Sequence, residues 1–110
     1  MALTITDKVI RGTDTRHVAE LHHFEARDAW RVTWLPLRLM DKDAAIAAME
    51  LAEAVGQIPA DCDPEVYDDG FWSRADALAA VFGMSGPDAV ARASESPEDA
   101  AERAAGGAGG

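Results

Sequence analysis

One stretch, Trp-Arg-Val-Thr-Trp-Leu at residues 30–35, constrains the fold of this chain most, because large apolar residues alternate in it with polar ones. A period of two places Trp30, Val32 and Trp34 on one face of a β-strand, where aromatic and β-branched side chains pack well. We therefore predict a strand that Pro36 ends and whose two tryptophans anchor the core.

Two further strands are predicted before this one. Residues 3–6 alternate in the same manner, and Val9 and Ile10 follow them ahead of a glycine turn, which together indicate a short first strand. Residues 18–25 are expected to form the second strand, joined to the tryptophan strand by a tight connection. Because apolar residues here also have helical spacing, a helix over residues 15–24 is the alternative.

The register of the predicted hairpin depends on the length of its loop. A three-residue loop places Phe24 opposite Trp30, so that the apolar sides of the two strands coincide. His22 then faces Val32. We favour this register because it buries Phe24 and leaves Glu25 in water. A two-residue loop would put a different set of residues on the tryptophan face, namely Leu21, His23 and Glu25.

The next predicted element is a helix that begins after Asp41, a favourable N-cap, and continues to Val55. Gly56 is expected to end it. Ile46 falls on the charged side of this helix and needs a cover, either a later aromatic segment or a second chain. The charged side comprises Lys42, Asp43, Glu50 and Glu53, and the apolar side comprises Ala45, Ala48, Met49, Leu51, Ala52 and Val55.

The second half of the chain carries the signals of a connector and of short helices. Prolines, a glycine and a run of acids across residues 59–70 indicate a surface connector, from which Val66, Tyr67, Phe71 and Trp72 are expected to fold back onto the core. Capping residues, prolines in the first turn and a closing glycine set the bounds of the helices after it. The expected helices are 73–82, 87–93 and a last one from Ser96.

Together these elements predict an α+β fold: a small three-stranded antiparallel sheet packed on one main helix and followed by short C-terminal helices. A length of 110 residues with 48% apolar content suits one domain with a single core. We assign residues 1–93 to this domain. Residues 94–110 are rich in alanine and glycine and have little to bury, so we expect them to be frayed or disordered.

The balance of charge limits the partners that we expect. Twenty acidic against ten basic residues give a net charge of −10, which opposes binding to nucleic acid and to anionic lipid surfaces. The same charge favours a basic or apolar protein surface as the partner, and mimicry of nucleic acid is an open alternative.

The single cysteine and the overall composition bear on the compartment. Because Cys62 is the single cysteine, no internal disulfide can form. The sequence shows neither a secretory signal nor a run of apolar residues long enough to cross a membrane. We therefore expect a cytoplasmic protein without membrane contact. The composition, with only two lysines, is typical of a high-GC genome and indicates a bacterial source, with the actinobacteria as the group it suggests.

The candidate metal ligands are three histidines, His17, His22 and His23, which lie close together with Glu20 and Glu25. Adjacent residues of a strand point to opposite faces, so His22 and His23 cannot both bind one ion without a bulge. No Cys-x-x-Cys, His-Glu-x-x-His or nucleotide-binding motif is present. A metal-dependent enzyme is therefore an alternative that ranks below a non-catalytic protein, and we expect neither a cofactor nor an enzyme.

Residues 74–93 resemble a helix-turn-helix, with a glycine turn between two short helices. In that resemblance Ser85 and Arg92 are the residues that would contact DNA. The helix that would read the bases opens with a glycine, a proline and Asp88, which offer few donors and bring a carboxylate towards phosphate. A DNA-binding regulator is therefore the runner-up, and we favour a plain helical hairpin.

We interpret the chain as a non-catalytic protein-interaction or regulatory module. The expected contact surface combines the charged side of the main helix with the aromatic residues after the connector. We expect a monomer or a weak homodimer, because burial of one isoleucine biases association without being enough to hold two chains together. The candidate partner-binding residues are Ile46, Glu50, Glu53, Phe71 and Trp72.

Overall fold

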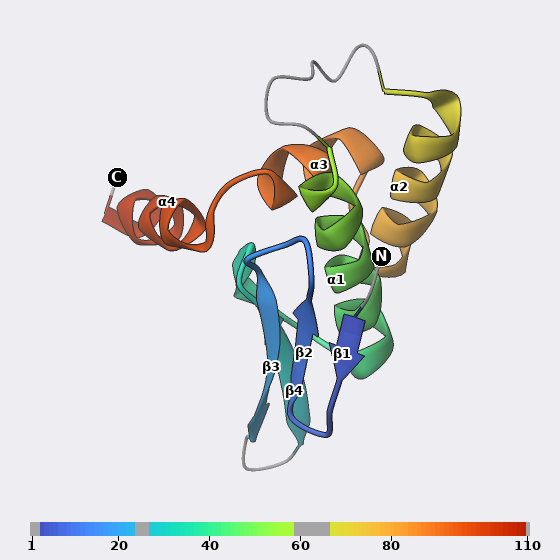
Figure 1. Ribbon diagram of the computed structural model, residues 1–110. Helices are drawn as coiled ribbons and strands as arrows, with labels where there is room; N and C mark the ends of the chain where they lie inside the picture. The colour runs from blue at the N-terminus through green and yellow to red at the C-terminus, as the bar shows by residue number, and fades with distance from the viewer. Residues whose placement is uncertain (1–2, 24–26, 59–66, 110) are drawn as a thin grey trace.

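The computed structural model describes residues 3–23, 27–58 and 67–109, which form an antiparallel sheet with helices against one face (Figure 1). The five strands are hydrogen-bonded in sequence order. The predicted α+β class is confirmed, but in the described residues the sheet has five strands instead of three, and four helices follow it. The elements are β1 (Leu3–Ile5), β2 (Val9–Gly12), β3 (Val18–His23), β4 (Asp28–Val32), β5 (Leu35–Met40), α1 (Lys42–Gly56), α2 (Asp69–Val81), α3 (Gly86–Ala93) and α4 (Pro97–Gly109).

The predicted first strand is in fact a hairpin of β1 and β2. Thr6 reverses the chain between them, because its hydroxyl accepts from the Val9 N–H at 3.0 Å and donates to the Val9 carbonyl at 2.9 Å. The pairing of Ile5 with Ile10 and of Leu3 with Gly12 then continues away from this turn. A threonine whose side chain bonds to the backbone supplies the turn without glycine.

A second unexpected hairpin joins β4 and β5. Val32 pairs with Leu35, so Thr33 and Trp34 form the turn, and the predicted strand over residues 30–35 ends three residues early, at Val32. Pro36 does not end the sheet, because it lies in β5 at the edge, where a missing backbone donor is tolerated. The predicted burial of the two tryptophans is confirmed.

The predicted strand over residues 18–25 is confirmed as β3, but its favoured register is wrong. Leu21 pairs with Trp30 and Ala19 with Val32, so the tryptophan face carries the odd-numbered residues of β3, as in the alternative register. Ala19 is fully buried where α1 crosses the sheet, and a larger side chain would not fit there. Phe24 and Glu25, on which the favoured register depended, lie outside the described residues.

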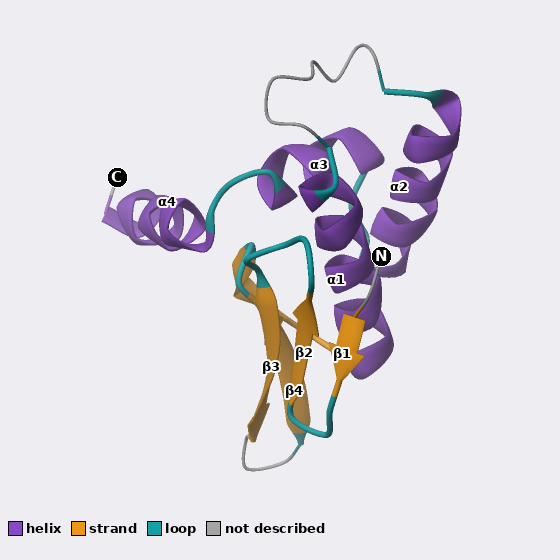
Figure 2. Cartoon of the chain, in the orientation of Figure 1, coloured by secondary structure: helices purple, strands orange, loops and turns teal. Residues whose placement is uncertain are grey.

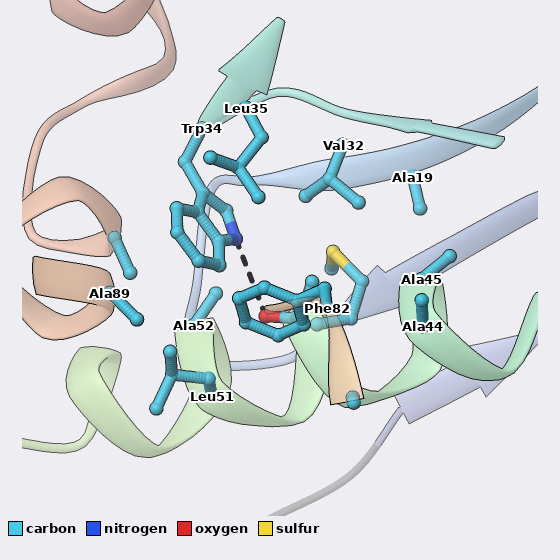
Figure 3. Close-up of a cluster of buried hydrophobic side chains, with 14 of the residues drawn as sticks. Ala19, Val32, Trp34, Leu35, Ala44, Ala45, Leu51, Ala52, Phe82 and Ala89 are labelled. Carbon is cyan, nitrogen blue, oxygen red and sulfur yellow. Dashed lines mark hydrogen bonds between the residues drawn. The ribbon is translucent and has the colours of Figure 1, made fainter. Parts of the chain in front are cut away.

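The core lies between the sheet and α1, and continues between α1 and the pair formed by α2 and α3 (Figure 3). Because α1 has neighbours on both sides, it is buried almost all round, and its many alanines allow those neighbours to approach closely. Trp34 fills the centre. Its indole N–H donates to the carbonyl of Ala48 at 3.3 Å, and its ring meets Phe82 edge-on at 5.6 Å between centroids.

Local capping sets the helix ends largely as predicted. Asp41 accepts from the Ala44 N–H at 2.8 Å and starts α1, and Ser85 caps α3. Gly56, the predicted stop, is instead the last helical residue, where a Cβ would overlap the carbonyl oxygen of Asp14. At the end of α2, Gly83 has φ of +76°, the left-handed conformation in which glycine closes helices.

The start of α2 differs from the prediction. The helix begins at Asp69 instead of Ser73, because the Asp68 carboxylate caps it by accepting from the Phe71 N–H at 2.7 Å. Tyr67, Phe71 and Trp72 are half-buried against the core and contact one another, with ring centroids 4.9–5.8 Å apart. Their predicted return to the core is confirmed; Val66 lies outside the described residues.

The last helix, α4, is set apart from the other three (Figure 2). The start signal at Ser96 is confirmed, since its hydroxyl accepts from the Asp99 N–H at 3.1 Å. Fraying or disorder beyond residue 94 concerns the behaviour of this helix in solution and stays a prediction. Among the described residues, no helix is long and apolar enough to cross a membrane.

Candidate functional site

A cleft of about 400 Å³ lies where the β2–β3 loop, the C-terminal end of α1 and the α3–α4 linker meet. Its wall combines apolar side chains from α1 with hydroxyl and charged side chains from the loop and the linker. Such a mixture suits a small polar ligand only if some of its polar groups remain free. The lining residues are Asp14, Thr15, Arg16, His17, Ala52, Val55, Gly56, Ile58, Tyr67, Ala93, Ser94, Glu95, Ser96 and Pro97.

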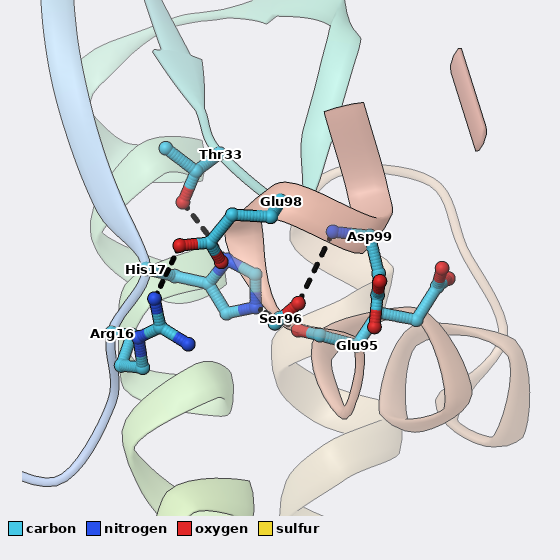
Figure 4. A network of polar contacts seen from close by, with 7 residues as sticks. All are labelled: Arg16, His17, Thr33, Glu95, Ser96, Glu98 and Asp99. Carbon is cyan, nitrogen blue, oxygen red and sulfur yellow. Dashed lines mark hydrogen bonds and ion pairs between the residues drawn. The ribbon is translucent and has the colours of Figure 1, made fainter. Parts of the chain in front are cut away.

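His17, in the wall of this cleft, uses both ring nitrogens within the fold (Figure 4). Its Nε2 lies 2.6 Å from the backbone carbonyl of Glu95 and must donate, because a carbonyl oxygen only accepts. Its Nδ1 lies 2.8 Å from the hydroxyl of Thr33, which already accepts from the Val18 N–H at 3.0 Å. The neutral tautomer with the proton on Nε2 therefore satisfies every partner.

The environment of His17 favours this neutral form. The residue is only 2% exposed, and burial is the main cause that lowers the pKa of its imidazole below 6.5, with the charge of Arg16 acting in the same direction. The backbone groups of Glu95 and Ala93 and the Glu95 carboxylate oppose the shift in this pKa without cancelling it. At neutral pH the ring is an uncharged structural link, with no free nitrogen for a ligand.

Charged groups of the linker and α4 surround the same cleft. Arg16 forms an ion pair with Glu98, in the first turn of α4, and Glu95 pairs with Arg103 at 2.9 Å. The pKa of the Glu98 carboxyl is held below its usual range. The main cause is a hydrogen bond from the backbone N–H of Glu98 itself, and the charge of Arg16 is a smaller one. The hydroxyls are also engaged, since Ser94 donates to the Val90 carbonyl at 2.7 Å. The polar wall therefore holds the fold together.

Glu53 is placed very differently from its prediction as a partner-binding residue on the charged side of α1. Its side chain is fully buried and accepts from the Thr13 N–H at 3.0 Å and from the Asp14 N–H at 2.5 Å. The expected exposure of Glu53 was wrong. Gly12 allows this approach, since a Cβ there would lie 2.7 Å from the Glu53 carboxylate. The residue holds the β2–β3 loop on α1 and has no surface to offer a partner.

The three candidate metal ligands are held apart. His17 lies in the loop before β3, whereas His22 and His23 point to opposite faces of the strand, as expected from their adjacency. His23 bonds instead to Asp28 across the hairpin at 2.6 Å. Within residues 3–23, 27–58 and 67–109, no three side chains of the ligating kinds come together. Cys62 lies outside these ranges.

The candidate helix-turn-helix over residues 74–93 corresponds to α2 and α3 with a four-residue connection. The hydroxyl of Ser85 accepts from the Asp88 N–H at 3.3 Å and so caps α3. Arg92 is exposed, but Asp88 is exposed on the same short helix, and the Asp76 carboxylate approaches its start by accepting from the Gly86 N–H at 3.1 Å. These carboxylates would face a phosphate backbone.

We expect no specific binding of duplex DNA, because the exposed part of α3 offers one cation beside acidic groups. Titration of a random-sequence duplex and of the duplex upstream of the gene, at low salt, should show no complex at about micromolar protein. A complex that weakens steeply with added salt and is lost in Arg92→Ala would contradict this expectation.

The remaining predicted partner residues keep partial exposure. Ile46, Phe71 and Trp72 are half-buried and pack against the core, and Glu50 is half-buried on α1. Part of each apolar side chain is therefore covered by the chain itself. Their role in partner binding stays a prediction.

Charge is segregated along the chain, a feature that no local motif displays. Residues 1–40, which include all five strands, contain six basic and five acidic residues. Residues 41–110, which include all four helices, contain four basic and fifteen acidic residues. The negative charge of the protein thus belongs to its helical half, and a count by segments would have found it.

Comparison of the chain with protein-family models, curated proteins and solved structures finds no match.

Proposed function

We propose that this chain is a non-catalytic protein-interaction module that binds a basic surface of a partner protein through its acidic helical half. The single observation that carries the proposal is the segregation of charge between residues 1–40, which include the strands, and residues 41–110, which include the helices. A concentrated field of one sign steers a partner of opposite charge and fixes its orientation, whereas the nearly balanced sheet contributes little to that field.

The state of the buried titratable groups supports a role without catalysis. Catalytic acids, bases and nucleophiles need a free atom directed at a substrate. Among the described residues, the buried polar side chains are His17 and Glu53, and both bond to groups of the fold itself. By contrast, exposed acids occur on each of the first three helices, for example Asp43, Asp69 and Asp88.

Neutralising these three acids tests the proposal. Tagged wild-type protein and the triple variant Asp43→Asn/Asp69→Asn/Asp88→Asn are used to capture partners from cells of the native source at low and high salt. We expect a basic partner that is retained by the wild type, released at about 1 M salt, where screening is nearly complete, and bound several-fold less by the variant. Each acid lies in the first turn of a helix, so stability must be measured alongside.

A matched variant separates position from net charge. Asp7→Asn/Glu20→Gln/Asp28→Asn removes the same three negative charges from the sheet half, where all three residues are exposed. This control variant should bind as much of the partner as the wild type does. Equal loss in both triple variants, or retention that is insensitive to salt in the wild type, would contradict a binding site formed by the helical half.

A further inference from the structure

The attachment of α4 to the rest of the molecule combines its proximity to β5 with polar contacts near its start. Over residues 97–103 only Ala100 is fully buried, and it is not part of the main core cluster. Burial of one alanine contributes little, and a helix of this length is marginal on its own. Besides the proximity of α4 to β5, the linker that precedes the helix is therefore the main candidate for what keeps α4 in place.

Two polar contacts join the linker and α4 to the β2–β3 loop in the described residues (Figure 4). The first is the hydrogen bond from His17 Nε2 to the Glu95 carbonyl, and the second is the ion pair of Arg16 with Glu98. The ion pair is largely exposed on both sides, with 69% and 67% of the side chains accessible, so water and salt weaken it. The buried histidine is the stronger attachment.

The hydrogen-bond chain around His17 has a fixed direction. The Val18 N–H donates to the Thr33 hydroxyl, that hydroxyl donates to Nδ1, and Nε2 donates to the Glu95 carbonyl. A proton added to Nδ1 would reverse this bond: the Thr33 hydroxyl hydrogen would turn away, and its oxygen would accept from Nδ1 as well as from the Val18 N–H. The added charge would also be enclosed in a site from which water is almost excluded. Protonation therefore opposes the docked arrangement.

We propose that His17 is a pH-operated latch that holds the α3–α4 linker against the sheet when neutral and releases α4 when protonated. Release would expose Ala100 and open the cleft on its linker side, so that α4 and the cleft wall become accessible together. The proposal is independent of the partner-binding role of the helical half.

The charges that face the latch determine the direction of the effect. Arg16 from the loop disfavours the imidazolium, and the Glu95 carboxylate, itself paired with Arg103 of α4, favours it. Glu98 of α4 is paired with Arg16, while Asp14 and Tyr67 complete the titratable lining of the cleft. No charged side chain comes from the turn of Thr33 and Trp34. Burial dominates, so the docked ring has the lower pKa.

The lower pKa of the docked ring fixes the direction in which docking of α4 depends on pH. A released His17 takes up a proton near its ordinary pKa of 6.5, whereas the docked ring takes it up only at lower pH. Docking is therefore complete above about pH 6.5 and is lost as pH falls below it. Between the two pKa values, each pH unit of acidification should shift the equilibrium towards release about tenfold.

Hydrogen exchange of the full chain between pH 7.5 and pH 5, corrected for the intrinsic rate, tests the latch. Protection of the amides of residues 99–103 should fall below pH 6.5 by up to about tenfold per pH unit, while protection of α1 stays unchanged. His17→Gln keeps an uncharged donor, so the exchange of its amides over residues 99–103 should not respond to pH in this range. Constant protection in the wild type, or the same pH response in His17→Gln, would overturn the latch.

Two further measurements keep the test decisive if His17→Gln does not fold. Glu98→Gln removes the ion pair with Arg16 but leaves the ring, so protection should be lower at every pH with an unchanged dependence on pH. Titration of the His17 ring by NMR in the wild type should give a midpoint below 6.5 that coincides with the loss of protection. A midpoint at or above 6.5, or loss of α1 protection in the same step, would refute release of α4 by His17.

Discussion

Trp34→Ala is expected to destabilise the protein by about 3–5 kcal/mol, because a fully buried indole leaves a cavity that its neighbours cannot fill. The variant also loses the hydrogen bond to the Ala48 carbonyl and the edge-on contact with Phe82. A domain of this size has a total stability of roughly 5–15 kcal/mol, so this loss is a large share of the total. Urea denaturation followed by circular dichroism measures the change without relying on tryptophan fluorescence.

Val81→Ala provides the control for that experiment. Val81 is 54% exposed on α2, so its truncation should change stability by less than about 0.5 kcal/mol. Trp34→Phe should fall between the two, because it keeps a ring against Phe82 and loses the indole N–H. A loss below about 1 kcal/mol in Trp34→Ala would mean that the core does not depend on this ring.

Burial of the tryptophans could be predicted from their alternation, but the hairpin that contains Trp34 could not. Two-residue hairpin turns usually contain glycine, asparagine or aspartate with positive φ. Thr33 and Trp34 are none of these residue types. In the described chain, no residue other than glycine has a positive φ. The chain instead reverses beside an irregularity between Arg31 and Val32. Without a local turn signal, one long strand was the reasonable prediction, and β5 was missed.

Helix starts were predictable where the cap is local. Asp41, Ser85 and Ser96 each accept from a backbone N–H three residues ahead, which is a pattern that the sequence displays directly. For α2 the same chemistry was available at both Asp68 and Ser73. Packing of Phe71 and Trp72 against the core favours the earlier start, and that contact is not visible in local sequence.

The roles of the two buried polar residues could not be predicted because their partners are distant in sequence. His17 bonds to the carbonyl of Glu95, 78 positions away, and Glu53 bonds to the N–H of Thr13, 40 positions away. On a helical projection Glu53 falls beside Glu50, so its side chain was expected to be exposed to solvent. The loop that covers Glu53 belongs to a hairpin whose place over α1 is set by the whole sheet.

Glu53→Ala is expected to cost about 2–4 kcal/mol, because two backbone donors of the β2–β3 loop lose a charged acceptor at once. The loop is partly exposed, so water can replace part of the hydrogen bonding that Glu53 supplied to its N–H groups. The loss of stability is therefore expected to be smaller than in Trp34→Ala. Glu53→Gln keeps one oxygen but directs an NH₂ group at the second donor, and should cost about 1–2 kcal/mol.

The control for Glu53 is Glu50→Ala, one helical turn earlier on α1, where the carboxylate is half-exposed; its truncation should change stability by no more than about 0.5 kcal/mol. Urea denaturation of the three variants gives the order of stability. Hydrogen exchange at the amides of Thr13 and Asp14 should rise in Glu53→Ala and remain near the wild-type rate in Glu50→Ala. If Glu53→Ala were no less stable than Glu50→Ala, the buried carboxylate would not be what holds the β2–β3 loop on α1. Packing of Ile10 and Gly12 against the helix would then have to hold the loop.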